Sequence, residues 1–345
     1  MNVADSNNDV SGDLDLDKIF SFQLDGFQLK ACEALNQGHS VVVSAPTGSG
    51  KTLIGEYAIY RAISHCKKVF YTTPLKALSN QKLRDFRDQF GEENVGLMTG
   101  DLSLNRKASI VVMTTEIFRN MLYASFESRE DPLADVETVV LDECHYMNDS
   151  QRGTVWEESI IHCPSSVQLV ALSATVANAG QLTDWIQRVH GPTQLIISEF
   201  RPVPLEFTFC SAKGLHPLLN EKGTGLHPNC KVWRSPKGHK RKGRLQKPPQ
   251  PQSPQIGFVV SEMAKRNMLP AIYFIFSRRG CDKAVREIGH LTLLDLKQQK
   301  QVKERLEEFI YLNPEAVREG IHSEALIRGI AAHHAGVLPA WKELI

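Results

Sequence analysis

Short apolar runs alternate with amphipathic stretches from Ser40 to about Pro204. Each run is three to five residues long and rich in β-branched side chains, which is typical of strands buried on both faces. Such strands alternating with helices predict an α/β fold, a parallel sheet with helices on both faces. The predicted strands are Val41–Val43, Lys68–Tyr71, Ile110–Met113, Val139–Leu141 and Gln168–Leu172, and the predicted helices are Ile54–Ala62, Ala77–Phe90, Glu116–Tyr123, Val155–Ile161 and Gly180–Val189.

The alternation stops between residues 211 and 255. Seven prolines and few apolar residues predict a loop or a disordered insert here. The segment holds ten Lys or Arg against one acidic residue. Its most basic stretch is Gly238–Arg244, for which a solvated linker and a nucleic-acid-contacting arm both stay open.

A second α/β domain is predicted to begin at Ile256. The pattern there gives a helix, a buried strand over Ala271–Phe276, and helices around Cys281–Ile288 and Asp295–Tyr311. The sequence stops at Ile345 within a further helical pattern, so we expect the second domain to be incomplete.

Composition narrows the class of protein. Apolar (42%) and charged (23%) contents are those of a globular protein, and no apolar run is long enough to predict a membrane span. The acidic N-terminus does not fit a secretory or transit peptide. Seven cysteines without a C-x-x-C pair favour reduced thiols, so we expect a cytoplasmic protein. The net charge of +1 neither supports nor excludes a nucleic-acid partner, because residues 211–255 carry +9 and the remainder −8.

A phosphate-binding loop is predicted between the first strand and the first helix. The sequence APTGSGKT begins at Ala45, where the common pattern has Gly. The glycines let backbone N–H groups turn toward phosphates, and the following helix N-terminus adds partial positive charge. Lys51 is expected to reach the β- and γ-phosphates of ATP, and the Thr52 hydroxyl to bind Mg²⁺. The residues expected to hold ATP are Thr47, Gly48, Ser49, Gly50, Lys51 and Thr52.

Two acidic residues end the fourth predicted strand. In parallel sheets the ligand crevice lies at the carboxyl ends of the strands. Asp142 can therefore hold Mg²⁺, and Glu143 can polarise the water that attacks the terminal phosphate. His145 is either a structural histidine or a link between the nucleotide site and the domain interface.

Seven short motifs occur in the order and spacing of superfamily-two helicases, which the sequence resembles. The flanking stretches Asp142–Glu158 and Arg201–Leu205 resemble the superkiller-type DExH-box RNA helicases, particularly bacterial and cyanobacterial members and their chloroplast relatives. The motifs are Phe22–Gln28 (adenine-sensing Q motif), Ala45–Thr52 (motif one), Thr73–Leu78 (motif one-a), Thr99–Asp101 (the GD element), Thr114–Glu116 (motif one-b), Asp142–His145 (motif two) and Ser173–Thr175 (motif three).

This resemblance implies tandem RecA-like P-loop domains, the second incomplete, and an ATP-driven motor that translocates along or unwinds nucleic acid. Its expected division is an acidic tail (1–18), a RecA-like ATP-binding helicase domain (19–210), a basic Pro-rich insert (211–255) and a partial second RecA-like domain (256–345). The implied partner is single-stranded RNA or an RNA duplex with a tail, and we expect a monomer. Protein partners are not predicted.

The resemblance also assigns roles to individual residues. Lys51, Asp142, Glu143 and His145 are implied to be catalytic, and Phe22 and Gln28 to contact the adenine. The hydroxyl and basic groups of the remaining motifs suit backbone phosphates rather than base edges, so binding independent of sequence is expected. The residues implied in nucleic-acid contact or coupling are Pro74, Lys76, Gly100, Asp101, Thr115, Ser173 and Thr175.

Three alternatives stay open from the sequence. The first is a DNA helicase or translocase of a neighbouring branch, since only 2′-OH contacts distinguish RNA. The second is a non-catalytic nucleic-acid-binding or scaffold protein with a relict ATP site. The third is a P-loop transport or metabolic ATPase. Because motif five and the arginine-bearing motif six are not in the sequence, we expect this chain alone to bind Mg·ATP but hydrolyse it poorly.

Overall fold

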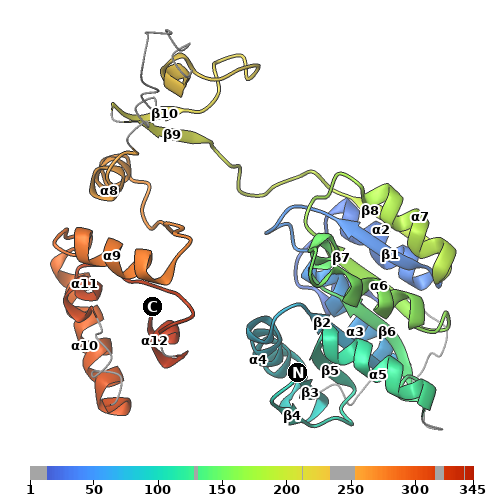
Figure 1. The fold of residues 1–345 in the computed structure, drawn as a ribbon. Helices are drawn as coiled ribbons and strands as arrows, with labels where there is room; N and C mark the ends of the chain where they lie inside the picture. The colour runs from blue at the N-terminus through green and yellow to red at the C-terminus, as the bar shows by residue number, and fades with distance from the viewer. Residues whose placement is uncertain (1–13, 128–130, 212, 234–252, 315–321, 338) are drawn as a thin grey trace, which may run out of the picture. The chain divides into compact units, whose positions relative to one another are not determined.

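The computed structural model describes residues 14–127, 131–211, 213–233, 253–314, 322–337 and 339–345. The chain divides into two compact units, Met1–Pro204 and Leu205–Ile345 (Figure 1). The basic stretch Gly238–Arg244 and most of the acidic tail lie outside the described residues. Their predicted roles, and the division into four segments, stay predictions.

An eight-stranded sheet forms the centre of the first unit. The strands lie in the order β4-β3-β5-β2-β6-β7-β1-β8, and every neighbouring pair is parallel except β3 with β4. Because β1 pairs with β7 and β8, the first strand lies near one edge of the order. The strands are β1 (Ser40–Ser44), β2 (Lys68–Thr73), β3 (Val95–Met98), β4 (Ser103–Leu104), β5 (Ile110–Thr114), β6 (Val136–Leu141), β7 (Gln168–Ser173) and β8 (Thr193–Ile197).

Helices cover both faces of this sheet (Figure 1). Val41 and Val43 of β1 join one buried apolar cluster and Val42 joins the other, as the two-residue repeat of a strand requires. The first cluster includes α2 (Gly26–Asn36), α3 (Thr52–Ser64) and α4 (Lys76–Phe90), and the second includes α5 (Thr115–Glu127), α6 (Gly153–His162) and α7 (Ala179–Val189).

The predicted α/β fold with a parallel sheet is confirmed in this unit. All five predicted strands and all five predicted helices occur, each within a few residues of its predicted ends. Three strands of the sheet, β3, β4 and β8, were not predicted. Short connecting elements are α1 (Leu16–Ile19), η1 (Glu92–Asn94) and η2 (Cys144–Asn148).

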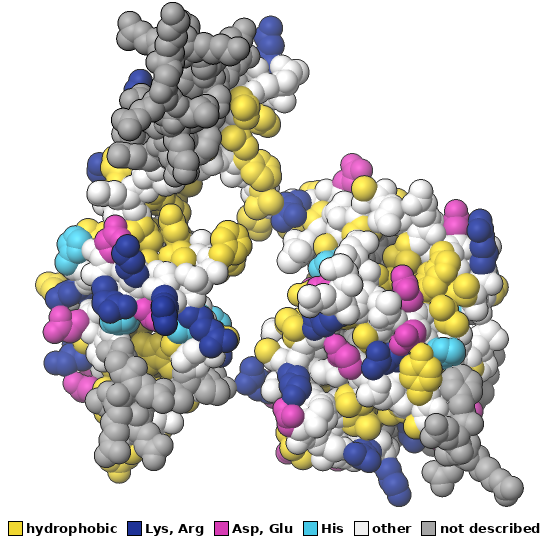
Figure 2. Space-filling view, viewed as in Figure 1, with side chains coloured by type: hydrophobic (Ala, Val, Ile, Leu, Met, Phe, Trp, Pro, Cys, Tyr) yellow, Lys and Arg dark blue, Asp and Glu magenta, His cyan; other side chains and the backbone are white. Residues whose placement is uncertain are grey.

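The second unit contains a two-stranded antiparallel sheet, five α-helices and one 3-10 helix among its described residues. The predicted buried strand over Ala271–Phe276 is wrong for this structure. These residues form no strand, and Ile272, Phe274 and Phe276 are largely exposed; hydrophobic side chains are visible on the surface of this unit in Figure 2. A parallel strand needs neighbours that accept and donate its backbone hydrogen bonds, and the described part of this unit offers none.

The first element of the second unit, β9, begins at Thr208, just before the predicted insert, and β10 and η3 lie inside it. The hairpin of β9 and β10 is followed by η3, where a loop was predicted, whereas the predicted helices of this unit are confirmed. The elements are β9 (Thr208–Ser211), β10 (Gly214–Pro217), η3 (Pro228–Trp233), α8 (Ile256–Lys265), α9 (Arg278–Ile288), α10 (Leu296–Leu312), α11 (Ser323–Ile327) and α12 (Pro339–Leu344). Among the described residues, no helix combines the length and the apolar character needed to span a membrane.

Substitution of Trp156 in α6 tests the packing of the second apolar cluster. It is fully buried, and its Nε1 forms no hydrogen bond with the described residues. Trp156→Ala should lower the free energy of unfolding by about 3–5 kcal/mol, because it leaves a large cavity. Trp156→Phe should cost about 1–2 kcal/mol, since it removes volume but no hydrogen bond. Urea unfolding measures both, and equal losses would contradict this packing role.

Candidate active site

The loops that follow the parallel strands all leave the sheet at its carboxyl edge. Their order in space therefore follows the order of the strands, not the order of the sequence. Neighbouring strand ends carry, in turn, Gly100 and Asp101 (after β3), Thr115 (β5), Pro74 and Lys76 (β2), Asp142, Glu143 and His145 (β6), Ser173 and Thr175 (β7) and the loop 45–51 (β1). Every predicted motif residue except Phe22 and Gln28 thus lies along one edge.

The phosphate loop has the conformation that its glycines permit. Gly48 and Gly50 have φ values of +83° and +82°, where a side chain would be strained. At Gly50 a Cβ would also lie 2.7 Å from Nε2 of Gln28. The Ser49 hydroxyl is buried and has no hydrogen-bond partner among the described residues. An unpartnered donor inside a loop of this shape fits a site that receives an anion.

Lys51 turns its ammonium back into the loop. Nζ donates hydrogen bonds to the carbonyl oxygens of Ala45 (2.8 Å) and Pro46 (2.9 Å). Burial lowers the pKa of Lys51, the carboxylates of Glu143 and Asp142 oppose that shift, and the charge of Arg201 adds to it. The lysine is therefore partly desolvated and close to both acids. Arg201 lies near enough to contribute to the electrostatics of this site.

Asp142 is held from two sides. Its backbone N–H donates to Thr72 O at 3.0 Å, its Oδ2 accepts a hydrogen bond from the buried hydroxyl of Tyr71 at 2.8 Å, and its Oδ1 accepts one from the Glu143 backbone N–H at 2.9 Å. Burial, followed by the Asp142 charge, raises the pKa of Tyr71 well above its usual value, so the phenol stays a donor. These bonds fix the plane of the carboxylate.

Glu143 adopts a left-handed conformation with φ of +52°, which is uncommon for a residue with a side chain. This turn separates β6 from η2 and leaves the carboxylate partly exposed. Glu143 Oε2 lies 3.2 Å from Nδ1 of His145. The same Nδ1 accepts a hydrogen bond from the backbone N–H of Ala174, at 3.5 Å. One ring nitrogen cannot donate to Glu143 and accept from Ala174 at once. His145 therefore bonds either to the turn after β6 or to the segment after β7, depending on whether Nδ1 carries a proton.

The segment after β7 is attached to the phosphate loop by backbone contacts. Ala45 N–H donates to Ser173 O at 3.2 Å, and Val176 N–H donates to the Ser44 hydroxyl at 3.4 Å. The Ser173 hydroxyl is buried and donates to Ala174 O, whereas Thr175 is exposed. Movement of this segment would therefore change the hydrogen bonds that it makes with the phosphate loop and with His145.

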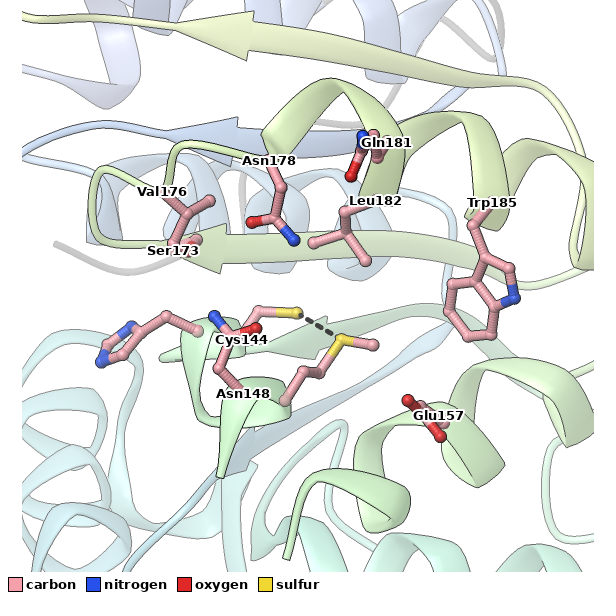
Figure 3. A pocket seen from close by; sticks show the side chains of 11 residues that line it. Cys144, Asn148, Glu157, Ser173, Val176, Asn178, Gln181, Leu182 and Trp185 are labelled. Atoms are coloured by element: carbon pink, nitrogen blue, oxygen red, sulfur yellow. Dashed lines mark hydrogen bonds between the residues drawn. The ribbon is translucent and has the colours of Figure 1, made fainter. Parts of the chain in front are cut away.

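A cavity of about 270 Å³ lies beside these residues (Figure 3). It separates the 173–178 segment and α7 from η2, and its wall includes the Cys144 thiol, which donates to Met147 Sδ at 3.6 Å. Burial raises the pKa of Cys144 to about 12, so this thiol is a packing residue rather than a nucleophile. No phosphate-loop residue is among those that line the cavity. The lining residues are Cys144, His145, Met147, Asn148, Glu157, Ser173, Val176, Asn178, Gln181, Leu182 and Trp185.

The predicted nucleic-acid residues lie close together at the β3, β5 and β2 ends. Lys76 forms an ion pair with Asp101, and a Cβ at Gly100 would lie 3.6 Å from Lys76 Nζ. Pro74 and Thr115 are buried, and the Thr115 hydroxyl donates to Thr73 O at 3.2 Å. Thr115 therefore holds the two segments together here, while Lys76 is the exposed cation.

Phe22 and Gln28 lie away from the sheet edge, and Gln28 contacts the phosphate loop. Gln28 is buried; its Oε1 accepts from Asp25 N–H at 2.8 Å and its Nε2 donates to Gly50 O at 3.1 Å. Phe22 is more than half exposed and contacts Phe20, with ring centroids 6.0 Å apart. Adenine contact by either residue stays a prediction, whereas the link from Gln28 to the loop is observed.

Three residues of this edge were not predicted to act there: Tyr71, Arg152 and Arg201. Tyr71 lies inside a predicted strand, where a tyrosine is ordinary core. Arg152 and Arg201 belong to the stretches that carry the family resemblance, but the sequence predicted no function for either residue. Tyr71 contacts Asp142, Arg152 contacts Pro74 and Glu116, and Arg201 lies near Lys51. Because these partners come from segments distant in the sequence, no local pattern could have found them.

Comparison with known proteins fits this arrangement. Residues 25–182 match the family model described as DEAD/DEAH box helicase. The chain contains a DEAD/DEAH box helicase domain. The matched residues include the phosphate loop, the acids after β6 and the segment after β7. The predicted superfamily-two DExH resemblance is thereby confirmed.

Curated relatives of this helicase domain are similar over nearly the whole chain. The chloroplastic DExH-box ATP-dependent RNA helicase DExH15 of Arabidopsis thaliana is 46% identical over 96% of this chain and 32% of its own length. The probable helicase HelY of Mycobacterium leprae is 40% identical (94% and 37%), and the exosome RNA helicase MTR4 of Mus musculus is 38% identical (95% and 32%). The chain thus spans about a third of the length of these relatives.

Proposed function

We propose that this chain is the ATP-binding part of an ATP-driven RNA helicase, in which hydrolysis is coupled to translocation along or unwinding of RNA. One observation carries the proposal. A single edge of the sheet holds the phosphate loop, both acids, His145 and the basic segment around Lys76 on neighbouring strand ends. Nucleotide and nucleic acid would therefore bind to adjacent loops of one rigid sheet.

ATP would enter the loop 45–52 with its phosphates facing the backbone amides and the Ser49 hydroxyl. Lys51 would exchange its two carbonyl partners for phosphate oxygens, which a partly desolvated ammonium favours because the new partners are anionic. Thr52 and Asp142 are the residues that would hold Mg²⁺, which neutralises charge on the phosphates when bound. The carboxylate plane fixed by Tyr71 and the Glu143 amide fits that role.

Glu143 would orient the attacking water and accept its proton. Its carboxylate is partly exposed at the turn after β6, next to Asp142 and 3.2 Å from His145. Protonation of Glu143 would then change the hydrogen bond between His145 and Ala174, because Nδ1 of His145 can bond to only one of the two residues at a time. In this way hydrolysis would alter the position of the segment that carries Ser173 and Thr175.

RNA is the proposed nucleic acid because two of the relatives named above are RNA helicases by name. An exposed lysine with its Asp101 partner, and loops rich in hydroxyl groups, suit phosphates and sugars rather than base edges. We propose that binding is independent of base sequence and that the protein acts as a monomer. DNA in place of RNA is the alternative, and the test below separates the two.

Glu143→Gln tests the proposed reaction. It should abolish RNA-stimulated ATP hydrolysis while ATP binding persists, because the amide keeps the shape but cannot accept the proton. The measurement is phosphate release from this chain, and from a form continued to the length of its relatives, without nucleic acid and with RNA or DNA single strands. The control is Glu33→Gln on α2, which should behave as wild type. If neither strand stimulates hydrolysis by the longer form, the helicase function fails; stimulation by DNA alone would replace RNA with DNA.

Tyr71→Phe tests how Asp142 is held. Loss of the hydroxyl frees one carboxylate oxygen, so the Mg²⁺ concentration for half-maximal hydrolysis should rise about tenfold, as is usual when a residue supporting a metal ligand is lost. Tyr57→Phe is the matched control, because Tyr57 is also fully buried and its hydroxyl donates to Asn36 at 2.6 Å, away from Asp142. An Mg²⁺ dependence that is the same in both variants would contradict this role for Tyr71.

A further inference from the structure

One arginine side chain contacts three segments to which the proposed function assigns different roles. Arg152 lies at the start of α6, where its backbone N–H donates to Asp149 Oδ1 at 3.1 Å. Its Nη1 donates to Pro74 O at 3.3 Å and lies 3.8 Å from Glu116 Oε1. Its guanidinium carbon lies 5.3 Å from the centroid of the Tyr146 ring.

Each of these partners belongs to a different part of the edge. Pro74 begins the loop after β2 that leads to Lys76, and Glu116 follows Thr115 in the first turn of α5. Tyr146 belongs to η2, directly after Glu143, and its ring lies 5.2 Å from that of His145. One guanidinium therefore joins two of the segments expected to meet nucleic acid, those after β2 and β5, to the segment that carries the nucleotide acids.

The chemistry of the contacts requires arginine. A planar guanidinium can donate to a carbonyl, pair with a carboxylate and stack over an aromatic ring at the same time, whereas an ammonium acts as a single point charge. The side chain is about one third exposed, and so is that of Glu116. Pro74 O, Glu116 and the Tyr146 ring together hold the guanidinium in place. Lys76 is more exposed and is paired with Asp101, so we expect Lys76 rather than Arg152 to contact a backbone phosphate.

We propose that Arg152 is a positioning residue that couples the RNA-contacting loops after β2 and β5 to the segment of Glu143 and His145. The proposal rests on the proposed function. Strain or displacement of the loop at Pro74 by bound RNA would move the guanidinium against Tyr146 and so shift η2. Arg152 would thereby set how strongly RNA stimulates hydrolysis, without touching the nucleotide.

Arg152→Gln tests this role, with Arg119→Gln as the matched control. Arg119 also pairs α5 with α6, through Glu158 at 3.5 Å, with a similar exposure but without contact to Pro74 or Tyr146 in the described structure. In the longer form that contains this chain, Arg152→Gln should leave hydrolysis without RNA within about twofold and lower the stimulation by saturating single-stranded RNA about tenfold. That loss corresponds to one hydrogen bond of a charged group. Arg119→Gln should change neither rate.

The salt dependence of RNA binding separates positioning from phosphate contact. Loss of one phosphate contact would reduce the slope of log affinity against log salt concentration by about 0.7 for a single strand. We expect an unchanged slope for Arg152→Gln. A reduced slope, or an equal loss of stimulation in Arg119→Gln, would overturn the proposal.

Hydrogen exchange provides a test that is independent of RNA. In this chain without nucleic acid, Arg152→Gln should speed amide exchange over residues 75–79, because the segment that Pro74 begins loses its anchor, while Arg119→Gln should not. Thermal unfolding of both variants shows whether the fold is retained. If wild-type hydrolysis does not respond to RNA, the proposed function fails, but faster exchange at residues 75–79 would still support the anchoring role. Unchanged exchange there would overturn it.

Discussion

The parallel register of the central strands is the constraint on which the site depends. Because β5, β2, β6, β7 and β1 are neighbours and all run in one direction, their carboxyl ends meet at one edge. Residues more than 100 positions apart, such as Ser44 and Ser173, become partners in register. The buried valines of these strands hold that register, since a slip of one residue would exchange the two faces of the sheet. The phosphate loop and the acids therefore need no contact with each other to be correctly placed.

A short series of contacts connects the acids after β6 with the segment after β7 and with η2. Asp142 and Glu143 share a turn, Glu143 and Ala174 compete for one nitrogen of His145, and the His145 ring lies against Tyr146. The cavity beside η2 leaves space into which the 173–178 segment and η2 could shift (Figure 3). A tightly packed core transmits small displacements rather than absorbing them. The site thus combines a fixed sheet with a few movable loops at its edge.

The sequence predicted the first unit well because its signals were local. Buried β-branched runs and the APTGSGKT loop indicate strands and a phosphate site without knowledge of neighbours. The strand β3 was missed because Gly96 interrupts its apolar run, β8 because it is partly exposed, and β4 because it is two residues long. The strand at 271–276 was wrong because apolar character alone does not supply a pairing partner. Tyr71 and Arg152 had no visible role, since each acts through a partner brought near only by the fold.

The central claim is that the loop after β1 and the acids after β6 form one site for Mg·ATP. Calorimetric titration of this chain with ATP, with and without Mg²⁺, tests it most directly. Lys51→Ala should weaken binding about 10- to 100-fold, the loss expected when a charged hydrogen-bond donor is removed, and Lys30→Ala on α2 should bind as wild type does. Binding that is unchanged in Lys51→Ala, or absent in the wild-type chain, would contradict the claim.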